Sequence, residues 1–302
     1  MEKPFILHLF TPEARVSPFD VNMAVDAGYQ VLMPYTGVEL PMVVGLTHDA
    51  IFSRGPKGVS RTGLFIGGRD VLLAADMLEA AQKAMVPPFV VSVCADPSGA
   101  YTTAAAMVAS VQHHLRRRHE RSLAGLRVLV LGGTGAVGRI AAVLAAREGA
   151  TVTLSSHTGQ AHASQAARAT GSRFNVSLQA CSGQHPEDVL SALQRCDVVL
   201  ATAAAGVRVL SLTQLQQAPS VLIAADLNAV PPSGIEGLGP LDDGVPLGGG
   251  QAVGIGALAI GNVKYQVQQQ LLRRMREAST PQCLSFEDAH RVACQHLGLV
   301  AA

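Results

Sequence analysis

The string Gly133-Thr134-Gly135-Ala136-Val137-Gly138 constrains the fold of this chain more than any other feature. An apolar run at 128–131 precedes it, and an amphipathic helix is expected to follow over 137–148. In this context Gly133 permits a tight turn, Gly135 lets the backbone approach a ligand closely, and Gly138 lets the helix pack against the strand. The positive end of the helix then faces a bound anion. The string therefore predicts a Rossmann-type strand–helix unit that binds the pyrophosphate of a dinucleotide.

The same alternation of strand and helix extends on both sides of a polar, arginine-rich stretch at 116–125. Before this stretch, strands are expected at 5–10, 30–35, 64–66 and 89–94, and helices at 18–27, 71–85 and 102–118. After it, strands are expected at 127–131, 151–154, 175–178, 197–201 and 221–225, a long loop at 238–250, and helices at 137–148, 262–277 and 286–296. Such alternation is typical of parallel sheets with helices on both faces.

These elements predict an α/β protein of two domains. Residues 125–261 are expected to form a Rossmann-type, doubly wound parallel sheet that binds NAD(P). Residues 1–124 are expected to form an α/β N-terminal domain for the substrate, which the C-terminal helices in 262–302 complete. Because open α/β sheets bind ligands outside the carboxyl ends of their strands, we expect the ligand-binding residues of both domains at those ends.

The composition narrows the classes of partner. The net charge is +1 and aromatic residues make up 4%, so the chain offers neither a strong field nor stacking platforms for nucleic acid. No apolar run reaches the roughly 18 residues that a membrane-spanning helix needs, and the N-terminus does not resemble a signal peptide. The 5 cysteines show no Cys-x-x-Cys spacing, which argues against a disulfide framework or a zinc site. We expect a cytoplasmic protein without metal, membrane or nucleic acid.

The end of the second Rossmann strand bears on the choice between NAD and NADP. NAD-selective sites usually place an Asp or Glu there, which accepts a hydrogen bond from the ribose 2′-hydroxyl. This chain has Ser155, Ser156 and His157 at that point and no carboxylate. Small hydroxyls and a histidine leave room for a 2′-phosphate, although an exposed loop histidine is an equal interpretation of His157. The pattern favours NADP and does not exclude NAD; Arg139 adds charge to this site or points to solvent.

Polar residues at the ends of other predicted strands are further candidates for the substrate site. Asp20 lies in the first turn of its helix, either as a cap or as a ligand contact, and Asp96 follows the fourth strand directly. Thr102 and Thr103 open the next helix, where their hydroxyls either satisfy the first turn or face a ligand. Lys264 follows a glycine-rich crossover, which favours a place in the site over an ordinary surface position.

Two residues of the Rossmann domain complete the candidate cofactor site. Ala203 lies in a run of small residues at 203–206, after the strand at 197–201, where a flat nicotinamide ring would need close approach. Asn228 follows the next strand at 221–225. Together with the glycine string and the residues at 155–157, they are expected to bind the nucleotide.

Several long strings together resemble one family far more specifically than the glycine loop does. They lie at 17–28, 34–38, 61–68, 95–106, 226–232 and 254–265, and include Ser-Pro-Phe-Asp at 17–20, Ala-Asp-Pro-Ser-Gly at 95–99 and Asp-Leu-Asn-Ala-Val-Pro-Pro at 226–232. On these strings the chain resembles the bacterial methylene-tetrahydromethanopterin dehydrogenases of one-carbon metabolism, over about residues 5–277.

The resemblance implies transfer of a hydride from methylene-tetrahydromethanopterin to NAD(P)+ in a homo-oligomer. It also implies that the pterin binds in a cleft between the N-terminal domain and the nucleotide domain. By position it places Asp20, Asp96, Thr102, Thr103 and Lys264 along the pterin. The chemistry of the reaction agrees with this set of residues, because the lone pairs of two ring nitrogens stabilise the methenyl cation as the hydride leaves. No strong base is then required, and positioning and electrostatics supply most of the rate.

Two other functions stay open at this point. Tetrahydrofolate has the same reactive ring nitrogens, so the chain could be a methylene-tetrahydrofolate dehydrogenase. It could also be a nucleotide-sensing protein that has the fold without the catalysis. A cyclohydrolase activity is not expected, because bifunctional folate enzymes carry a Tyr-x-x-x-Lys motif, whereas none of the tyrosines at 29, 35 and 101 has a lysine four residues later.

Overall fold

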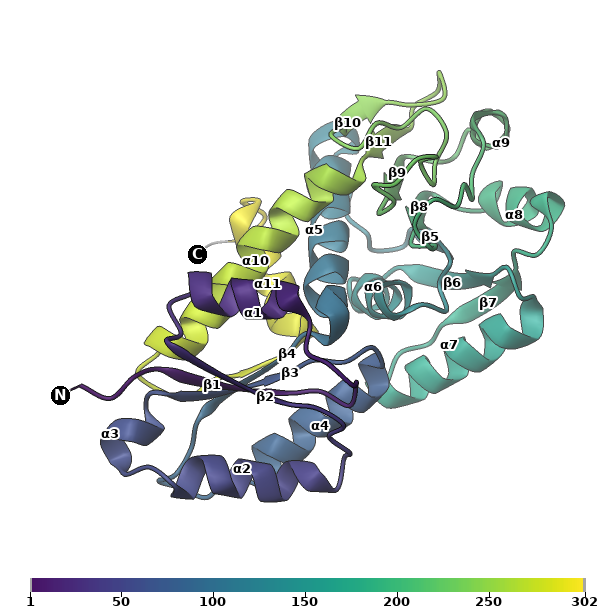
Figure 1. The fold of residues 1–302 in the computed structure, drawn as a ribbon. Coiled ribbons are helices and arrows are strands. Elements are labelled where there is room, and N and C mark those ends of the chain that lie inside the picture. Colours follow the sequence, from purple (N-terminus) through teal and green to yellow (C-terminus); the bar gives the residue numbers. More distant parts are fainter. Residues whose placement is uncertain (1, 301–302) are drawn as a thin grey trace. The chain divides into compact units, whose positions relative to one another are not determined.

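In a computed structural model, which describes residues 2–300, the chain forms two compact units (Figure 1). The first unit contains the residues up to Thr102 together with Tyr265–Val292, and the second contains Thr103–Lys264 together with the residues from Ala293 onward. The chain passes from one unit to the other inside helices α5 (Ala100–His119), α10 (Ala257–Glu277) and α11 (Phe286–His296). The boundaries predicted at 124/125 and 261/262 each lay just outside a predicted helix, whereas these units divide inside helices.

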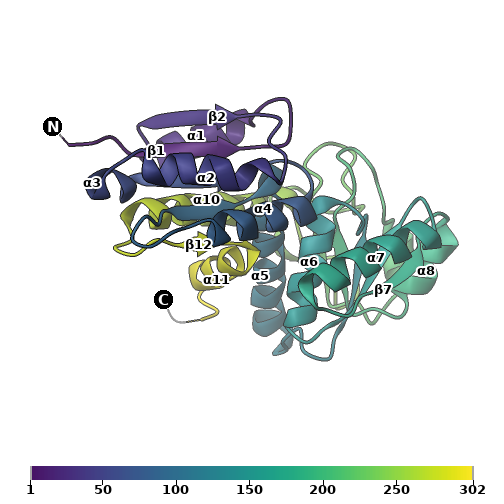
Figure 2. The ribbon, with the colours of Figure 1, turned by 90° about the horizontal axis from the view of Figure 1, so that it is seen from below.

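The sheet of the first unit has five parallel strands in the order β12-β4-β3-β1-β2. Their bounds are β1 (Ile6–Phe10), β2 (Val31–Tyr35), β3 (Thr62–Ile66), β4 (Ser92–Ala95) and β12 (Cys283–Leu284). Helices α1 (Pro18–Asp26) and α10 lie over one face, and α2 (Met42–Phe52) and α4 (Val71–Lys83) cover the other, as Figures 1 and 2 show. A short helix, α3 (Pro56–Val59), precedes β3, and α11 (Phe286–His296) follows β12.

Burial explains where each strand lies in this sheet. All five residues of β3 are buried, as expected of a central strand that packs against helices on both faces. The edge strand β2 is half exposed and contains Pro34, which lacks a backbone N–H. Helix α4 begins at Asp70, whose carboxylate accepts the backbone N–H groups of Leu72 and Leu73 at 2.8 and 3.2 Å.

The sheet of the second unit has seven strands in the order β10-β11-β9-β8-β5-β6-β7. Their bounds are β5 (Arg127–Leu131), β6 (Thr151–Ser156), β7 (Gln179–Ser182), β8 (Val198–Ala201), β9 (Ile223–Asp226), β10 (Asp243–Pro246) and β11 (Val253–Ile255). Only the β10–β11 pair is antiparallel among the strands that the structure describes. The six parallel strands have the order 3-2-1-4-5-6 of a dinucleotide-binding sheet, which confirms the predicted doubly wound fold.

Helices cover both faces of this second sheet. Helices α6 (Ala136–Arg147) and α7 (Gln160–Phe174) pack together over β5, β6 and β7 (Figure 2). On the other face, α8 (Pro186–Leu193) and α9 (Leu212–Gln216) contribute to a core that includes Leu129, Val199 and Ala224 from three neighbouring strands. This arrangement leaves the carboxyl ends of β5 and β8 side by side, at the point where the strand order reverses.

Two predicted segments of the second unit are wrong. The strand expected at 175–178 lies instead at 179–182, because Asn175 adopts a left-handed conformation (φ 53°) and ends α7. The loop expected at 238–250 contains β10, which the surrounding glycines concealed. Five helices were not predicted: α2, α3, α7, α8 and α9.

Candidate functional site

In the loop between β5 and α6, the individual glycines have different roles from those that the motif predicts. The tight turn occurs at Gly132, which has a φ of +71°, one residue before the motif. A Cβ on Gly133 would come within 2.9 Å of the Leu154 side chain and of the Val130 carbonyl oxygen. A Cβ on Gly138 would lie 2.6 Å from Thr202 Oγ1 and 2.8 Å from Gly133 Cα. Gly133 and Gly138 therefore permit close packing of the loop and helix on the sheet.

Gly135 is the glycine of the motif where a Cβ would have free space. It is exposed, and the nearest atom to a Cβ there would be the Gly132 carbonyl oxygen at 3.5 Å. Its φ of −74° is one that any residue adopts, so neither packing nor backbone strain requires glycine at this position. It stands at the N-cap of α6, where the free N–H groups and the helix dipole favour an anion. The loop therefore fits a pyrophosphate, and close approach of that group is a reason for glycine here.

Ala203 lies against the glycine loop at the reversal of strand order. A Cβ on Gly132 would come within 2.7 Å of Ala203 Cα, so the two backbones are in contact. Thr202 joins the loops, because its N–H and its Oγ1 both donate to the Leu131 carbonyl oxygen, at 2.8 and 3.0 Å.

Asn228 connects the loops that follow β8 and β9. Its Oδ1 accepts the N–H groups of Gly206 and Val230, both at 3.0 Å, and its Nδ2 donates to the Pro232 carbonyl oxygen at 2.8 Å. The buried Asp226 carboxylate supports the same turn by accepting the N–H groups of Asn228 and Ile235, at 2.9 and 3.1 Å. Burial raises the pKa of Asp226 above its usual value, although these backbone hydrogen bonds lower it. The Asn228 side chain therefore fixes the loop that follows β9 to the loop that follows β8.

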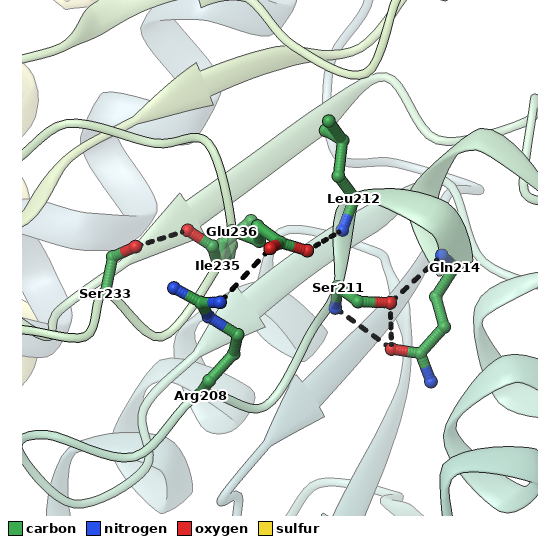
Figure 3. A network of polar contacts seen from close by, with 7 residues as sticks. All are labelled: Arg208, Ser211, Leu212, Gln214, Ser233, Ile235 and Glu236. Atoms are coloured by element: carbon green, nitrogen blue, oxygen red, sulfur yellow. Dashed lines mark hydrogen bonds and ion pairs between the residues drawn. The ribbon is translucent and has the colours of Figure 1, made fainter.

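A polar network holds the outer parts of the same two loops together (Figure 3). Glu236 is its centre, because one carboxylate oxygen accepts from Arg208 Nη1 at 3.1 Å and the other accepts the Leu212 N–H at 2.9 Å. Ser211 caps α9 by accepting the Gln214 N–H at 3.2 Å, and Ser233 Oγ donates to the Ile235 carbonyl oxygen at 2.8 Å. The segments at 203–216 and 226–236 are thus tied together through side chains.

The residues at the end of β6 divide into buried and exposed. Ser155 and Ser156 are buried, and Ser156 Oγ lies 3.0 Å from His162 Nδ1 and accepts the Thr158 N–H at 3.2 Å. His157 is exposed, which leaves it alone among the three with a side chain directed away from the fold. Arg139 reaches back to the glycine loop, where its Nε donates to the Thr134 carbonyl oxygen at 2.9 Å. A guanidinium group therefore lies at the glycine loop.

The first unit contains a cavity of about 410 Å³ at the carboxyl ends of β1 and β3. Its polar lining consists of Thr11, Glu13, Arg15, Ser17, Asp20, Arg69 and Ser98, and the backbones of Gly67 and Gly68. Of the predicted site residues only Asp20 lines it; the residue is 5% exposed, so it faces the cavity from a largely buried position. Ser98 has a φ of 50°, and its Oγ donates to the Gly68 carbonyl oxygen at 2.8 Å. A strained residue that holds a glycine loop is common at ligand sites.

Sequence reasoning missed Glu13, Arg15 and Arg69, which also line the cavity. A signal was present, because Glu13 and Arg15 follow the strand expected at 5–10, and Arg69 follows the one expected at 64–66. The rule that ligands bind at carboxyl strand ends could have found all three.

Asp96 and Thr102 contact each other at the start of α5. Asp96 Oδ1 accepts the N–H groups of Tyr101 and Thr102, at 3.0 and 3.1 Å, and its Oδ2 accepts the Thr102 hydroxyl at 2.7 Å. Both residues are buried, at 1% and 0% exposure, so the pair stabilises the first turn of α5. Thr103 and Lys264 are half-buried residues of α5 and α10.

Within residues 2–300, no group of three or more His, Cys, Asp or Glu side chains is gathered in a way that could hold a metal ion. In the same part of the chain, no helix combines the length and the apolar character needed to cross a membrane.

Solved structures share the two-unit fold. An NAD-dependent malic enzyme from Thermotoga maritima superposes with a TM-score of 0.56, at 11% identity over 96% of this chain and 84% of that chain. Shikimate 5-dehydrogenase from Listeria monocytogenes, in complex with shikimate and NAD, superposes with a TM-score of 0.51, at 12% identity over 89% of this chain and 91% of that chain. At such identities the likeness supports the α/β fold alone.

Sequence comparisons are far more specific. Residues 18–98 match the family model described as methylene-tetrahydromethanopterin dehydrogenase, N-terminal. The bifunctional protein MdtA of Methylorubrum extorquens is 34% identical over 91% of this chain and 93% of its own length. The NAD(P)-dependent methylenetetrahydromethanopterin dehydrogenase of the same organism is 49% identical over 97% of this chain and 99% of its own length. The chain therefore belongs to the family of NAD(P)-dependent methylenetetrahydromethanopterin dehydrogenases.

Proposed function

We propose that this protein oxidises methylene-tetrahydromethanopterin to the methenyl form and transfers the hydride to NAD(P)+. The observation that carries the proposal is the 49% identity, over 97% of the chain, to an enzyme named for that activity. The open Gly135 at the N-terminus of α6 supports the nucleotide half of the reaction, and the cavity of the first unit supports the pterin half.

The chain's own residues supply position and charge in this reaction. The glycine loop and the start of α6 hold the pyrophosphate, and the Ala203 backbone beside the loop leaves room for a flat ring. The nicotinamide, when bound, accepts the hydride. Asp20 presents a carboxylate to the cavity, where a negative charge favours the cationic methenyl product over the neutral substrate. No residue has to remove a proton, because the hydride leaves with its electron pair.

The remaining candidate residues have supporting or orienting roles in this proposal. Asp96 and Thr102 are hydrogen-bonded to each other, so they act on the site by stabilising the start of α5. We assign Thr103 and Lys264 to the pterin side, where the ammonium group of Lys264 would orient carbonyl groups of the carrier. Asn228 acts on the cofactor through the loops that it joins.

An assay with purified protein tests the function directly. Reduction of each nicotinamide cofactor is followed by absorbance with methylene-tetrahydromethanopterin and, separately, with methylene-tetrahydrofolate. We expect turnover with the first carrier at a higher kcat/KM than with the second. No reduction of either cofactor at micromolar enzyme rejects the proposal, and a reversed ratio assigns the folate carrier.

Two lysine variants distinguish an enzyme from a nucleotide-sensing protein. Lys264→Ala should lower kcat/KM by about tenfold or more, since it removes a charged contact to the carrier. Lys57→Ala, on the exposed helix α3, is the matched control and should leave turnover unchanged. Equal turnover in both variants contradicts a catalytic site at Lys264.

We also propose that the protein is a homo-oligomer. Light scattering after size-exclusion chromatography measures the oligomeric state.

For the cofactor we propose NADP as the preferred acceptor, with NAD as a second one. Ser155 and Ser156 turn inward, so the exposed His157 is the residue of this strand end that is free to meet a 2′-phosphate. His157→Asp should therefore raise the dissociation constant for NADP by about tenfold and change that for NAD much less, because a carboxylate repels the phosphate. Calorimetric titration with each nucleotide measures the two dissociation constants. If both change equally, the 2′ position of the ribose lies away from His157.

A further inference from the structure

The two oxygens of the Asp20 carboxylate face different neighbours. Oδ1 accepts a hydrogen bond from Gln268 Nε2 at 3.3 Å. Oδ2 lies on the side of Gly67, since a Cβ on that glycine would be 3.9 Å from it, and Gly67 lines the cavity. Gln268 therefore contacts one oxygen of a carboxylate that lines the cavity, and the other oxygen lies near the Gly67 backbone of the cavity wall.

Gln268 and Gln269 attach α10 to α1 at two points within the first unit. Both are buried, at 1% and 4% exposure. Gln269 Nε2 donates to the Met23 backbone carbonyl oxygen at 3.0 Å, one helical turn after Asp20. Adjacent glutamines thus make contacts of different kinds: Gln268 reaches a side chain that lines the cavity, and Gln269 reaches only the backbone and sulfur of Met23.

We infer that Gln268 is a positioning residue, which orients the Asp20 carboxylate toward the ligand in the cavity of the first unit. The inference rests on the proposed function, in which that ligand is the pterin carrier. Asp20 is 5% exposed, and a buried carboxylate gains from each donor, because desolvation is costly and hydrogen bonds to charged groups are strong. A buried amide also restricts the rotation of the carboxylate, which keeps it ready for a cationic product.

The glutamine pair provides its own control. Gln268→Met has a similar length but no donor, and it should lower kcat/KM for the carrier by about tenfold. The KM for NAD(P) should change less than about twofold, since the contact lies in the first unit. Gln269→Met removes a buried hydrogen bond of α1 without touching Asp20, so it should lower Tm as much as Gln268→Met does and leave kcat/KM within about twofold.

A double-mutant cycle with Asp20→Ala distinguishes positioning from a general structural role. If Gln268 acts through Asp20, then Gln268→Met has no further effect on kcat/KM in the Asp20→Ala background. Additive losses, or equal losses for Gln268→Met and Gln269→Met, overturn the inference. Should Gln268→Met fail to fold, Gln268→Glu replaces it, because it keeps the size and polarity and exchanges the donor for a second carboxylate; its loss must be at least as large. A wild-type protein that reduces neither cofactor rejects the proposed function instead.

Discussion

At the scale of single residues, glycines of the same motif are required for different reasons. Gly133 and Gly138 would clash with the fold if they had a Cβ, at 2.9 and 2.6 Å from their nearest neighbours. Gly135 would meet nothing closer than 3.5 Å. Packing therefore explains two of the glycines, whereas neither packing nor backbone strain explains the third, which is the glycine that fits the proposed pyrophosphate contact. The sequence motif cannot separate these reasons, because it lists the residues without their neighbours.

Alanine substitutions turn this difference into a prediction. Gly138→Ala should cost about 1–3 kcal/mol of folding free energy, because the methyl group meets Thr202 and the backbone of Gly133. Gly135→Ala should leave the free energy of unfolding within about 0.5 kcal/mol of wild type. It should nevertheless weaken NAD(P) binding by about tenfold or more, since the methyl group takes the place of the pyrophosphate oxygens. Urea unfolding and nucleotide titration measure the two effects; unchanged affinity in Gly135→Ala contradicts a pyrophosphate at this loop.

At the scale of secondary-structure elements, an ion pair joins the starts of β5 and β8. Arg127 donates from Nε and Nη2 to the two oxygens of Asp197, at 3.0 and 2.7 Å, and its backbone N–H donates to the same carboxylate at 2.8 Å. Hydrogen bonds from Arg127 hold the pKa of Asp197 below its usual value of 3.8. The pair lies at the opposite end of these strands from the glycine loop, so it affects stability without touching the site.

Replacement of this carboxylate should give a pH-dependent loss of stability. Asp197→Asn should lower the free energy of unfolding at pH 7 by about 1 kcal/mol, a modest value because Arg127 is half exposed. A carboxyl with a lowered folded pKa stabilises the fold fully above its unfolded pKa of 3.8, and this contribution is lost as the pH falls through the folded pKa. The difference between wild type and variant should therefore shrink below about pH 4. Urea unfolding across this range tests it; Asp49→Asn, on the exposed side of α2, is the control and should show no such difference.

The elements also show what sequence periodicity could and could not predict. The strands at 6–10, 31–35 and 127–131 were predicted to within one residue, because each is a short run of large apolar side chains. Helix α7 was missed, since its buried face consists of Ala163, Ala166, Ala167, Thr170 and Phe174, which have helical spacing but little hydrophobicity. Its start at Gly159 also lacks a side-chain cap. The roles of Asp96 and Asn228 depend on hydrogen bonds that only the folded backbone brings together, so their positions were predictable and their partners were not.

At the scale of the whole molecule, the five cysteines report on both units. Cys94 and Cys283 belong to the first unit, and Cys181, Cys196 and Cys294 belong to the second. Burial raises the pKa of Cys196 to about 12 and that of Cys283 and Cys294 to about 11, and it raises the pKa of Cys94 well above its usual value. At pH 8 a thiol with a pKa of 11 is ionised to a fraction on the order of 10⁻³, so native thiols should react slowly with alkylating reagents.

Labelling of these thiols along a urea gradient should therefore follow unfolding, with mass spectrometry to assign each site. Helices α5, α10 and α11 each have residues in both units, so loss of either unit removes helical turns that the other unit shares. For this reason we expect Cys94 in the first unit and Cys196 in the second to become reactive over the same range of urea concentration. A control at fixed urea with the unfolded chain gives the intrinsic rate of each thiol. Reactivity of Cys196 at a urea concentration where Cys94 is still protected would show that the units unfold separately, and that the shared helices do not couple them.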